Sequence, residues 1–351
     1  MTMHDHASIL TGRRQLLAAG AGLFAAGLTR PALAQAQPET VRFSCDFRIY
    51  GGTAPFFYGV DKGFFREVGI DASVDGSAGS ADAVTRVATG AYEFGCADIS
   101  TLVEFAARNR AAAPKLLMPI YDRFAAAIVS PKTRGITTLQ ALRGKNLGTG
   151  QADAPSRILP ALLRKQNIDP SSINRMMVDV KLRDSMLLQG RVDAVVGFDY
   201  TVLFNLLSSG LKPEDTNLIY FADNGFNFYG QGLIVNPAVL ERNPDLCRRM
   251  AIAVTRSWLE SAKDPETAIE SVMRREALSD RSVELARLKW VLDKLILTPN
   301  VRTNGLGEAS AQRLSDGIAV LAEGFQMENP PKVTDIFDGR FIPDIALRRV
   351  G

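Results

Sequence analysis

Histidine is almost absent from this chain of 351 residues, and the two that occur, His4 and His6, stand among the first six positions. Cysteine is scarce as well, and three cysteines cannot form a disulfide framework. The formal net charge of +3 is too small for a protein that binds nucleic acid or a membrane surface. The 46% of hydrophobic and 23% of charged residues exclude wholesale disorder, so we expect one or two compact domains.

The first 34 residues have the pattern of a cleavable signal peptide. Arg13 and Arg14 precede a soft apolar stretch at 16–28, and an Ala-Leu-Ala ending follows at 32–34. An uncleaved anchor is disfavoured because the stretch is shorter than the ~18–20 residues that span a bilayer. The paired arginines resemble a twin-arginine signal, although Leu16 replaces the usual Phe and leaves the Sec route open. We therefore expect export to the periplasm with residues 1–34 removed.

Removal of this segment leaves a mature chain without histidine. A His-dependent catalytic triad, a His-ligated zinc site and imidazole acid–base catalysis are therefore excluded. The three cysteines, Cys45, Cys96 and Cys247, remain. Cys45 and Cys96 fall on expected strands of the same half of the molecule. Either one disulfide joins these two, or all three cysteines are buried free thiols.

Strands and helices alternate along the rest of the chain. The expected strands are 41–47, 70–75, 94–97, 115–120, 125–129, 145–149, 176–180, 192–196, 218–221 and 232–235. The expected helices are 54–67, 80–89, 100–107, 138–142, 155–166, 184–189, 200–208, 244–263, 265–275, 282–297 and 308–324. Repeated βαβ units predict an α/β fold with parallel sheets covered by helices on both faces.

Three strand-to-helix junctions, at 50–55, 75–80 and 148–156, are rich in small and turn-forming residues, and Thr53 enters the first helix. In open parallel sheets the ligand binds beyond the carboxyl ends of the strands, where helices begin. The free N–H groups of a first helical turn suit a carboxylate, a sulfonate or a phosphate. Each glycine also suits a tight turn without a ligand, but three such junctions favour a binding site. Neither a P-loop nor a dinucleotide fingerprint is present.

Aromatic and charged side chains accompany these junctions. Phe56 and its neighbours can form a flat wall for a planar or aliphatic ligand. Asp122, Asp153, Arg157 and Asp199 are the charged residues closest to expected strand ends. Asp153 can instead cap the helix that it precedes. Asp122 and Asp199 have no such role, so each, if buried, needs a positive partner from the ligand or from the protein.

Several segments, in order, resemble the periplasmic substrate-binding proteins for nitrate, sulfonates, taurine and thiamine precursors. They are 54–71 (APFFYGVDKGFFREVGID), 80–84 (SADAV) with 87–90 (VATG), 94–98 (FGCAD), 136–148 (ITTLQALRGKNLG) and 190–194 (GRVDA). Each segment alone is weak evidence, but the ordered set is specific. The resemblance covers about residues 41–262.

The resemblance implies a two-lobed periplasmic-binding-protein-like fold of type II, in which each lobe is a parallel-rich sheet flanked by helices. With hinge crossings near 121–124 and 223–228, residues 35–122 and 225–351 would make the first lobe and 123–224 the second. By analogy, the residues that contact the ligand are Ser77, Ser80, Asp98, Asp153, Pro155, Ser156 and Tyr200, and Tyr229 closes the rim.

The implied function is that of a monomeric solute-binding component of an ATP-driven importer, working with a membrane permease and an ATPase. No catalytic residue, cofactor or metal comes with the resemblance. A sensor that partners a membrane kinase fits the same sequence. An enzyme of the pyrimidine-synthesis type on this fold is disfavoured, because such chemistry draws on histidine and clustered cysteines.

Two ligand classes compete, and the anionic class is preferred, with the pyrimidine as the alternative. The helix starts and Arg157 favour a sulfonate, a taurine-like compound or an aromatic carboxylate, whereas the aspartates and aromatic residues favour a thiamine-precursor pyrimidine. One departure from many relatives is that Trp258 and Trp290 both fall on expected C-terminal helices and not in the binding loops.

Overall fold

Strands and helices alternate from Glu39 to Arg348 in the computed structural model, which describes residues 37–150 and 154–350. The predicted signal peptide at 1–34 and the predicted site residue Asp153 lie outside these ranges. Within the described ranges, no helix combines the length and the apolar character that crossing a membrane requires.

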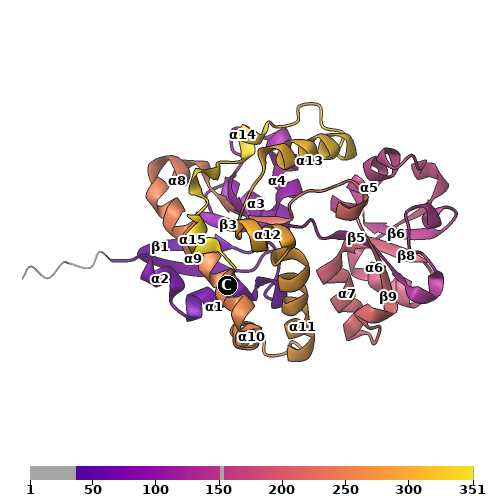
Figure 1. Cartoon of the computed structure of the whole chain (residues 1–351), viewed down its shortest axis with the longest axis horizontal. Coiled ribbons are helices and arrows are strands. Elements are labelled where there is room, and N and C mark those ends of the chain that lie inside the picture. Colours follow the sequence, from indigo (N-terminus) through magenta and orange to yellow (C-terminus); the bar gives the residue numbers. More distant parts are fainter. Residues whose placement is uncertain (1–36, 151–153, 351) are drawn as a thin grey trace, which may run out of the picture. The chain divides into compact units, whose positions relative to one another are not determined.

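The described residues form two five-stranded sheets, which are drawn in Figure 1. The first sheet has the order β2-β1-β3-β10-β4 and the second the order β7-β6-β8-β5-β9. The strands are β1 (Glu39–Ser44), β2 (Ile70–Asp75), β3 (Phe94–Asp98), β4 (Lys115–Pro119), β5 (Ala126–Pro131), β6 (Asn146–Gly150), β7 (Asn174–Val178), β8 (Ala194–Phe198), β9 (Thr216–Tyr220) and β10 (Gln231–Val235).

Each sheet contains one antiparallel strand, β10 in the first and β5 in the second. The chain passes from the first sheet into the second at β5, and it returns from the second sheet to the first at β10. A strand that enters in this way has no helical crossover to hold it parallel to its neighbours. The sheets are therefore mixed rather than wholly parallel, and the predicted parallel-rich, two-lobed fold is confirmed. The predicted crossings at 121–124 and 223–228 lie within the connecting segments 120–125 and 221–230.

Three helices flank the second sheet, α5 (Ala154–Lys165), α6 (Val180–Leu188) and α7 (Asp199–Ser208). The first lobe holds α1 (Ala54–Asp61), α2 (Phe64–Glu67), α3 (Ser80–Ala88), α4 (Ile99–Arg108), α8 (Pro237–Arg242), α9 (Pro244–Lys263), α10 (Pro265–Met273), α11 (Arg281–Val291), α12 (Pro299–Asn304), α13 (Ala311–Gly324), α14 (Val333–Ile336) and α15 (Ile345–Arg348). Figure 1 shows the C-terminal helices, in orange and yellow, around the first sheet.

The C-terminal helix boundaries follow from local capping. Asn243 and Asp264 accept hydrogen bonds from backbone N–H groups of the next helix, and a proline follows each of them, so α9 and α10 begin where the sequence predicts. The helix expected at 308–324 begins three residues later, because Ser310 accepts a hydrogen bond from the Arg313 N–H at 3.2 Å and caps α13. The helix expected at 282–297 ends as α11 at Val291, and a π-helical turn follows.

Aromatic side chains fill the interior of both lobes and of the crossings. The Trp258 ring, on α9, lies 5.6 Å from Phe56 and 5.7 Å from Tyr121. Phe124 in the first crossing lies 4.9 Å from Phe226 in the second. The two crossings are therefore packed against each other through their own side chains.

Helix α13 packs tightly against the second crossing at Gly317, where an added Cβ would lie 1.9 Å from Cδ2 of Phe228. We expect Gly317→Val to lower the free energy of unfolding by about 1–3 kcal/mol, because the new side chain must displace this ring. Urea denaturation measures the effect. Ala319→Val, on the exposed face of the same helix, is the matched control and should change stability by less than about 0.5 kcal/mol. Equal effects of the two substitutions would contradict the close packing.

Candidate functional site

Three neighbouring strand ends bring polar side chains to one edge of the first sheet. Asp46 follows β1 by two residues, Asp98 ends β3, and Gln231 begins β10. Because β10 is antiparallel, its first residue lies at the same edge as the last residue of β3, and Gln231 stands opposite Asp98 in the register. The Gln231 side-chain amide donates to Asp46. All three side chains are buried.

Three tyrosines surround this edge. The Tyr200 ring, at the start of α7 in the second lobe, lies 6.4 Å from Tyr50 and 5.9 Å from Tyr121, which both belong to the first lobe. The rings are buried. We call Asp46, Tyr50, Tyr121, Tyr200 and Gln231 the central cluster. It is built from both lobes, and Tyr200 is the part that the second lobe contributes.

Burial keeps the acids of the central cluster in their neutral forms over a wide pH range. Burial, followed by the nearby charge of Asp98, raises the pKa of Asp46 to about 7, despite hydrogen bonds that favour the ionised form. Burial also raises the pKa values of Tyr50, Tyr121 and Tyr200, and the negative charge of Asp46 adds to each shift. The cluster is therefore a low-dielectric site that disfavours further negative charge.

Two polar atoms of the central cluster have no hydrogen-bond partner among the described residues, the Tyr50 hydroxyl and Oε1 of Gln231. The side chains that carry them are 2% and 1% exposed. A buried polar atom without a partner costs free energy, so native proteins rarely keep one unless a ligand, an ion or water completes the arrangement.

The second lobe adds Asp199, which lies directly before Tyr200. Its Oδ2 accepts hydrogen bonds from the Tyr220 hydroxyl at 2.6 Å and from Nε1 of Trp290 at 2.9 Å. Trp290 lies on α11 of the first lobe, so this hydrogen bond joins the two lobes. Burial raises the pKa of Asp199, and its hydrogen bonds oppose that shift. The direct partners of the buried Asp199 are therefore neutral donors of the protein, and not the positive charge that the sequence led us to expect.

A buried ion pair on helix α11 also contacts the chain segments at Tyr50 and at Tyr200. Arg287 and Glu284 are 3.0 Å apart, and Oε2 of Glu284 accepts a hydrogen bond from the Gly51 N–H at 2.7 Å. Arg287 donates to the Tyr200 carbonyl oxygen. The guanidinium charge is therefore committed to protein groups.

A pocket of about 370 Å³ lies at the start of α5, the third junction noted in the sequence. Ser156 and Arg157 line it together with Phe325, which follows α13 in the first lobe. Nη1 of Arg157 lies 2.6 Å from Glu104 on α4, and its guanidinium lies 4.3 Å above the Phe325 ring. Arg157 thus also joins the two lobes, and its charge is paired.

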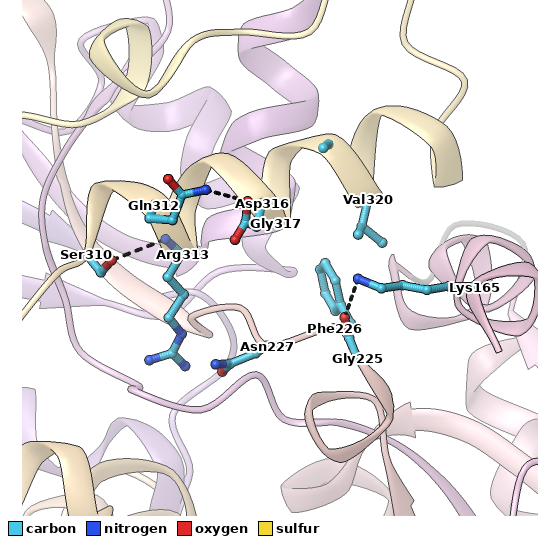
Figure 2. A pocket seen from close by; sticks show the side chains of 11 residues that line it. Lys165, Gly225, Phe226, Asn227, Ser310, Gln312, Arg313, Asp316, Gly317 and Val320 are labelled. Carbon is cyan, nitrogen blue, oxygen red and sulfur yellow. Dashed lines mark hydrogen bonds between the residues drawn. The ribbon is translucent and has the colours of Figure 1, made fainter.

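A second pocket, of about 510 Å³, lies beside the second crossing and is drawn in Figure 2. Arg313 extends from α13 toward this crossing, and Lys165 reaches it from α5, donating to the Gly225 carbonyl oxygen at 2.9 Å. Nη1 of Arg313 lies 2.9 Å from the Asp122 carboxylate, and Nη2 donates to the Phe228 carbonyl oxygen at 3.0 Å. Asp122 is thus paired with a protein cation and connects the two crossings.

The structure brings some of the predicted site residues to the interface of the lobes and places others elsewhere. Asp98, Asp199 and Tyr200 lie at the central cluster or next to it, and Pro155, Ser156 and Arg157 lie at the start of α5. Asp122 and Tyr229 belong to the crossings, where the Tyr229 hydroxyl accepts a hydrogen bond from Ser310.

The remaining predicted residues serve the first lobe. Ser77 bonds within its own turn, and the Ser80 hydroxyl accepts a hydrogen bond from the Asp98 N–H at 3.0 Å, which fixes the strand end. Thr53 is buried and accepts a hydrogen bond from the Tyr50 N–H at 3.1 Å. Phe56 is fully buried between Phe43 and Trp258 and belongs to the core.

Sequence reasoning missed Asp46, Gln231, Glu284, Arg287 and Arg313. Asp46 carried no usable signal, because the expected strand continued through it to residue 47, whereas β1 ends at Ser44. Gln231 carried none, because its position depends on the antiparallel entry of β10. Glu284 and Arg287 lie on α11 and Arg313 lies on α13, far along the chain from the segments that they contact.

The cysteines are buried and free, so no disulfide joins Cys45 to Cys96 in the described structure. Burial, followed by hydrogen bonding to Cys45, holds the pKa of Cys96 well above its usual value. Across residues 37–150 and 154–350, no group of three or more His, Cys, Asp or Glu side chains is arranged to hold a metal ion.

Comparison with known proteins gives a consistent set of relatives. Residues 52–268 match the family model described as NMT1/THI5 like. The riboflavin-binding protein RibY of Chloroflexus aurantiacus is 22% identical over 297 residues, which are 83% of this chain and 82% of that protein.

Solved structures share the fold. The aliphatic sulphonate-binding protein SsuA of Escherichia coli superposes with a TM-score of 0.66 at 12% identity, over 84% of this chain and 94% of that one. The nitrate-binding protein NrtA of Synechocystis gives a TM-score of 0.63 at 11% identity, over 88% of each chain. The desulfurization enzyme DSZB gives 0.57 at 14% identity, over 88% of this chain and 99% of that one. The fold is thus that of periplasmic binding proteins, and it also occurs in an enzyme.

Proposed function

The chain belongs to the NMT1/THI5-like family, and on that premise we propose that it is the solute-binding component of an ABC importer. It captures a small organic ligand between its two lobes and delivers it, as a monomer, to a membrane permease and its ATPase. The observation that best supports this proposal is the central cluster, which lies where the carboxyl ends of strands from the two sheets face each other. It retains two buried polar atoms without a partner among the described residues.

Ligand capture requires the lobes to separate, because Tyr200 covers the first-lobe part of the cluster. The segments 120–125 and 221–230 connect the sheets and serve as the hinge, with lobes at 35–122 with 225–351 and at 123–224. In the open form Tyr200 leaves with α7 and exposes Tyr50 and Gln231. The ligand then favours the closed form through contacts with both lobes, and the permease recognises that form.

The protein works in the periplasm after export, with residues 1–34 removed. It leaves the ligand chemically unchanged: the described residues contain no histidine, and the raised pKa of Cys96 keeps its thiol protonated and unreactive. Because an enzyme shares the fold, mass spectrometry of compounds carried through purification provides the direct check. We expect one compound to be released intact on denaturation, and release of a converted product would contradict the transport function.

The two tryptophans provide an internal reporter of closure. Trp290 bonds Asp199 across the lobes, whereas Trp258 is buried within the first lobe. We expect ligand binding to change the fluorescence of Trp290, and the change to persist in Trp258→Phe and to disappear in Trp290→Phe. If the signal instead follows Trp258, the lobes do not move relative to each other on binding.

A further inference from the structure

Two pairs of helices cross the boundary between the lobes. Helix α5 of the second lobe packs on α13 of the first, and α7 of the second lobe packs on α11 of the first. The α5–α13 pair adjoins the second crossing, where Lys165 on α5 donates to the Gly225 carbonyl oxygen at 2.9 Å (Figure 2). The α7–α11 pair adjoins the central cluster, because Tyr200 lies in the first turn of α7. The two contacts differ in chemistry, and that difference indicates which of them separates when the lobes open.

The contact between α5 and α13 is apolar and closely packed. Its side chains belong to one buried cluster that is continuous across the two lobes and includes Ile158, Leu159 and Leu162 of α5 and Leu314, Ile318 and Leu321 of α13. At Gly324, which ends α13, an added Cβ would lie 3.1 Å from the Ile158 Cα and 3.8 Å from the Ala161 Cβ. Separation of these helices would expose the cluster to water, which costs free energy in proportion to the apolar area exposed. This contact therefore resists opening.

The contact between α7 and α11 is held by hydrogen bonds that can break without leaving a charge unpaired. Trp290 donates to Asp199 at 2.9 Å, but Asp199 also accepts a hydrogen bond from Tyr220 in its own lobe. Arg287 donates to a carbonyl oxygen in the first turn of α7, but it is also paired with Glu284 on its own helix. Each charged group thus keeps a partner when α7 leaves, so the large cost of an unpaired buried charge does not arise.

The apolar part of the α7–α11 contact is limited. Of the α11 side chains that pack on the second lobe, Val283 is buried, whereas Ala286 and Trp290 are only partly buried. The Trp290 ring meets Phe204 edge-on, with the ring centroids 6.1 Å apart. Because fewer buried side chains contribute here than between α5 and α13, separation exposes less apolar area.

We infer that the lobes open asymmetrically, with α5 and α13 staying in contact as a pivot while α7 separates from α11, so that solute enters the central cluster between α7 and α11. Access requires α7 to move, since it carries Tyr200, whereas no residue of α5 belongs to the cluster. Trp290 and Arg287, the α11 side chains that bond to α7, form the latch. This inference rests on the proposed capture of a solute between the lobes.

X-ray scattering from the protein in solution, dialysed free of small molecules, measures opening through the radius of gyration. Trp290→Ala removes the hydrogen bond to Asp199 and the ring contact with Phe204 together. We expect it to raise the radius of gyration by about 1 Å, from the roughly 20 Å of a compact chain of this size. Lys289→Ala, which breaks a contact of the same helix with Glu266 inside the first lobe, is the matched control and should leave the radius unchanged.

An unchanged radius of gyration in Trp290→Ala would overturn the latch. If Trp290→Ala does not fold, Trp290→Phe takes its place, because it removes the N–H donor and keeps an aromatic ring against Phe204. It should raise the radius in the same direction by a smaller amount, and no rise in that variant would equally overturn the latch.

A disulfide across the pivot tests whether α5 and α13 stay together. In Ala161→Cys combined with Gly324→Cys, the two Cβ atoms would lie 3.8 Å apart, a spacing that suits a disulfide. Oxidised glutathione forms the bond by accepting the two electrons and two protons of the thiols, and dithiothreitol reverses it. With Trp290→Ala in the same chain, we expect an equal rise in the radius of gyration in the oxidised and reduced forms. A rise that the disulfide suppresses would overturn the pivot, as would failure of the pair to oxidise.

The outcomes separate this inference from the proposed function. Suppression of opening by the disulfide, in a protein that releases an intact compound on denaturation, overturns the pivot and leaves solute capture standing. Opening that the disulfide does not suppress, in a protein that releases a converted product, leaves the pivot standing and contradicts the transport function alone.

Discussion

Arg313→Met is expected to lower the free energy of unfolding by about 3–5 kcal/mol, because it leaves the Asp122 carboxylate buried without its cation. Both side chains are largely buried, at 16% and 8% exposure. The guanidinium also donates to the carbonyl oxygens of Asp122 and Phe228, one in each crossing. The loss therefore falls on the segments that connect the lobes. Chemical denaturation monitored by circular dichroism measures it.

Two further variants isolate the cause of that loss. Arg164→Met breaks an exposed ion pair with Glu323 and should cost no more than about 1 kcal/mol. Arg313→Met combined with Asp122→Leu removes both charges and should recover part of the stability lost in Arg313→Met, since no uncompensated charge stays buried. If Asp122→Leu instead lowers the stability of the double variant further, by as much as an independent second substitution would, the unpaired charge of Asp122 is not the cause of the loss in Arg313→Met.

Asp46→Asn is expected to change how stability depends on pH. The folded protein raises the pKa of Asp46 to about 7, from an ordinary value of 3.8. The protonated form is therefore favoured by folding, and its contribution is fully present below pH 4 and is lost as pH rises toward 7. Relative to Asp46→Asn, the wild type should lose on the order of 4 kcal/mol between pH 4 and pH 7, and no more above it.

Urea denaturation of both proteins at intervals from pH 4 to pH 8 measures this difference. Asp316→Asn, which changes an exposed aspartate on α13, is the control and should run parallel to the wild type. Parallel curves for the wild type and Asp46→Asn would show that Asp46 titrates as it does in the unfolded chain. That result would contradict the burial of Asp46 in a low-dielectric site. It would also contradict the burial of Tyr50, because the two side chains belong to the same cluster.

Local sequence patterns predicted the helices and strands, but they did not predict which residues of the two lobes come into contact. Pro244 and Pro265, each preceded by a capping Asn or Asp, mark helix starts that depend on adjacent residues alone. Gln231 depends on β10 entering the first sheet against the direction of its neighbours, and nothing in 231–235 reveals that direction. The sequence could also not show that Trp290, on a C-terminal helix, donates a hydrogen bond to Asp199 in the other lobe.

The candidate site divides in the same way. Asp98 and Tyr200 were expected by analogy with the family that the sequence resembles, and each also follows a buried strand and opens a helix, which is a local pattern. Phe56 has that local pattern as well, yet α9 places Trp258 against it and makes it part of the core. Arg313 reaches Asp122 across 191 positions of the chain, so the partner of that buried acid emerges only from the fold.

A crystal structure of the purified protein with its bound compound tests solute capture most directly. We predict density for an unmodified small molecule between the carboxyl ends of the two sheets, touching Gln231 and Tyr50 from the first lobe and the segment at Tyr200 from the second. Density confined to the pocket between α13 and the second crossing, with the central cluster still closed on itself, would contradict capture between the lobes.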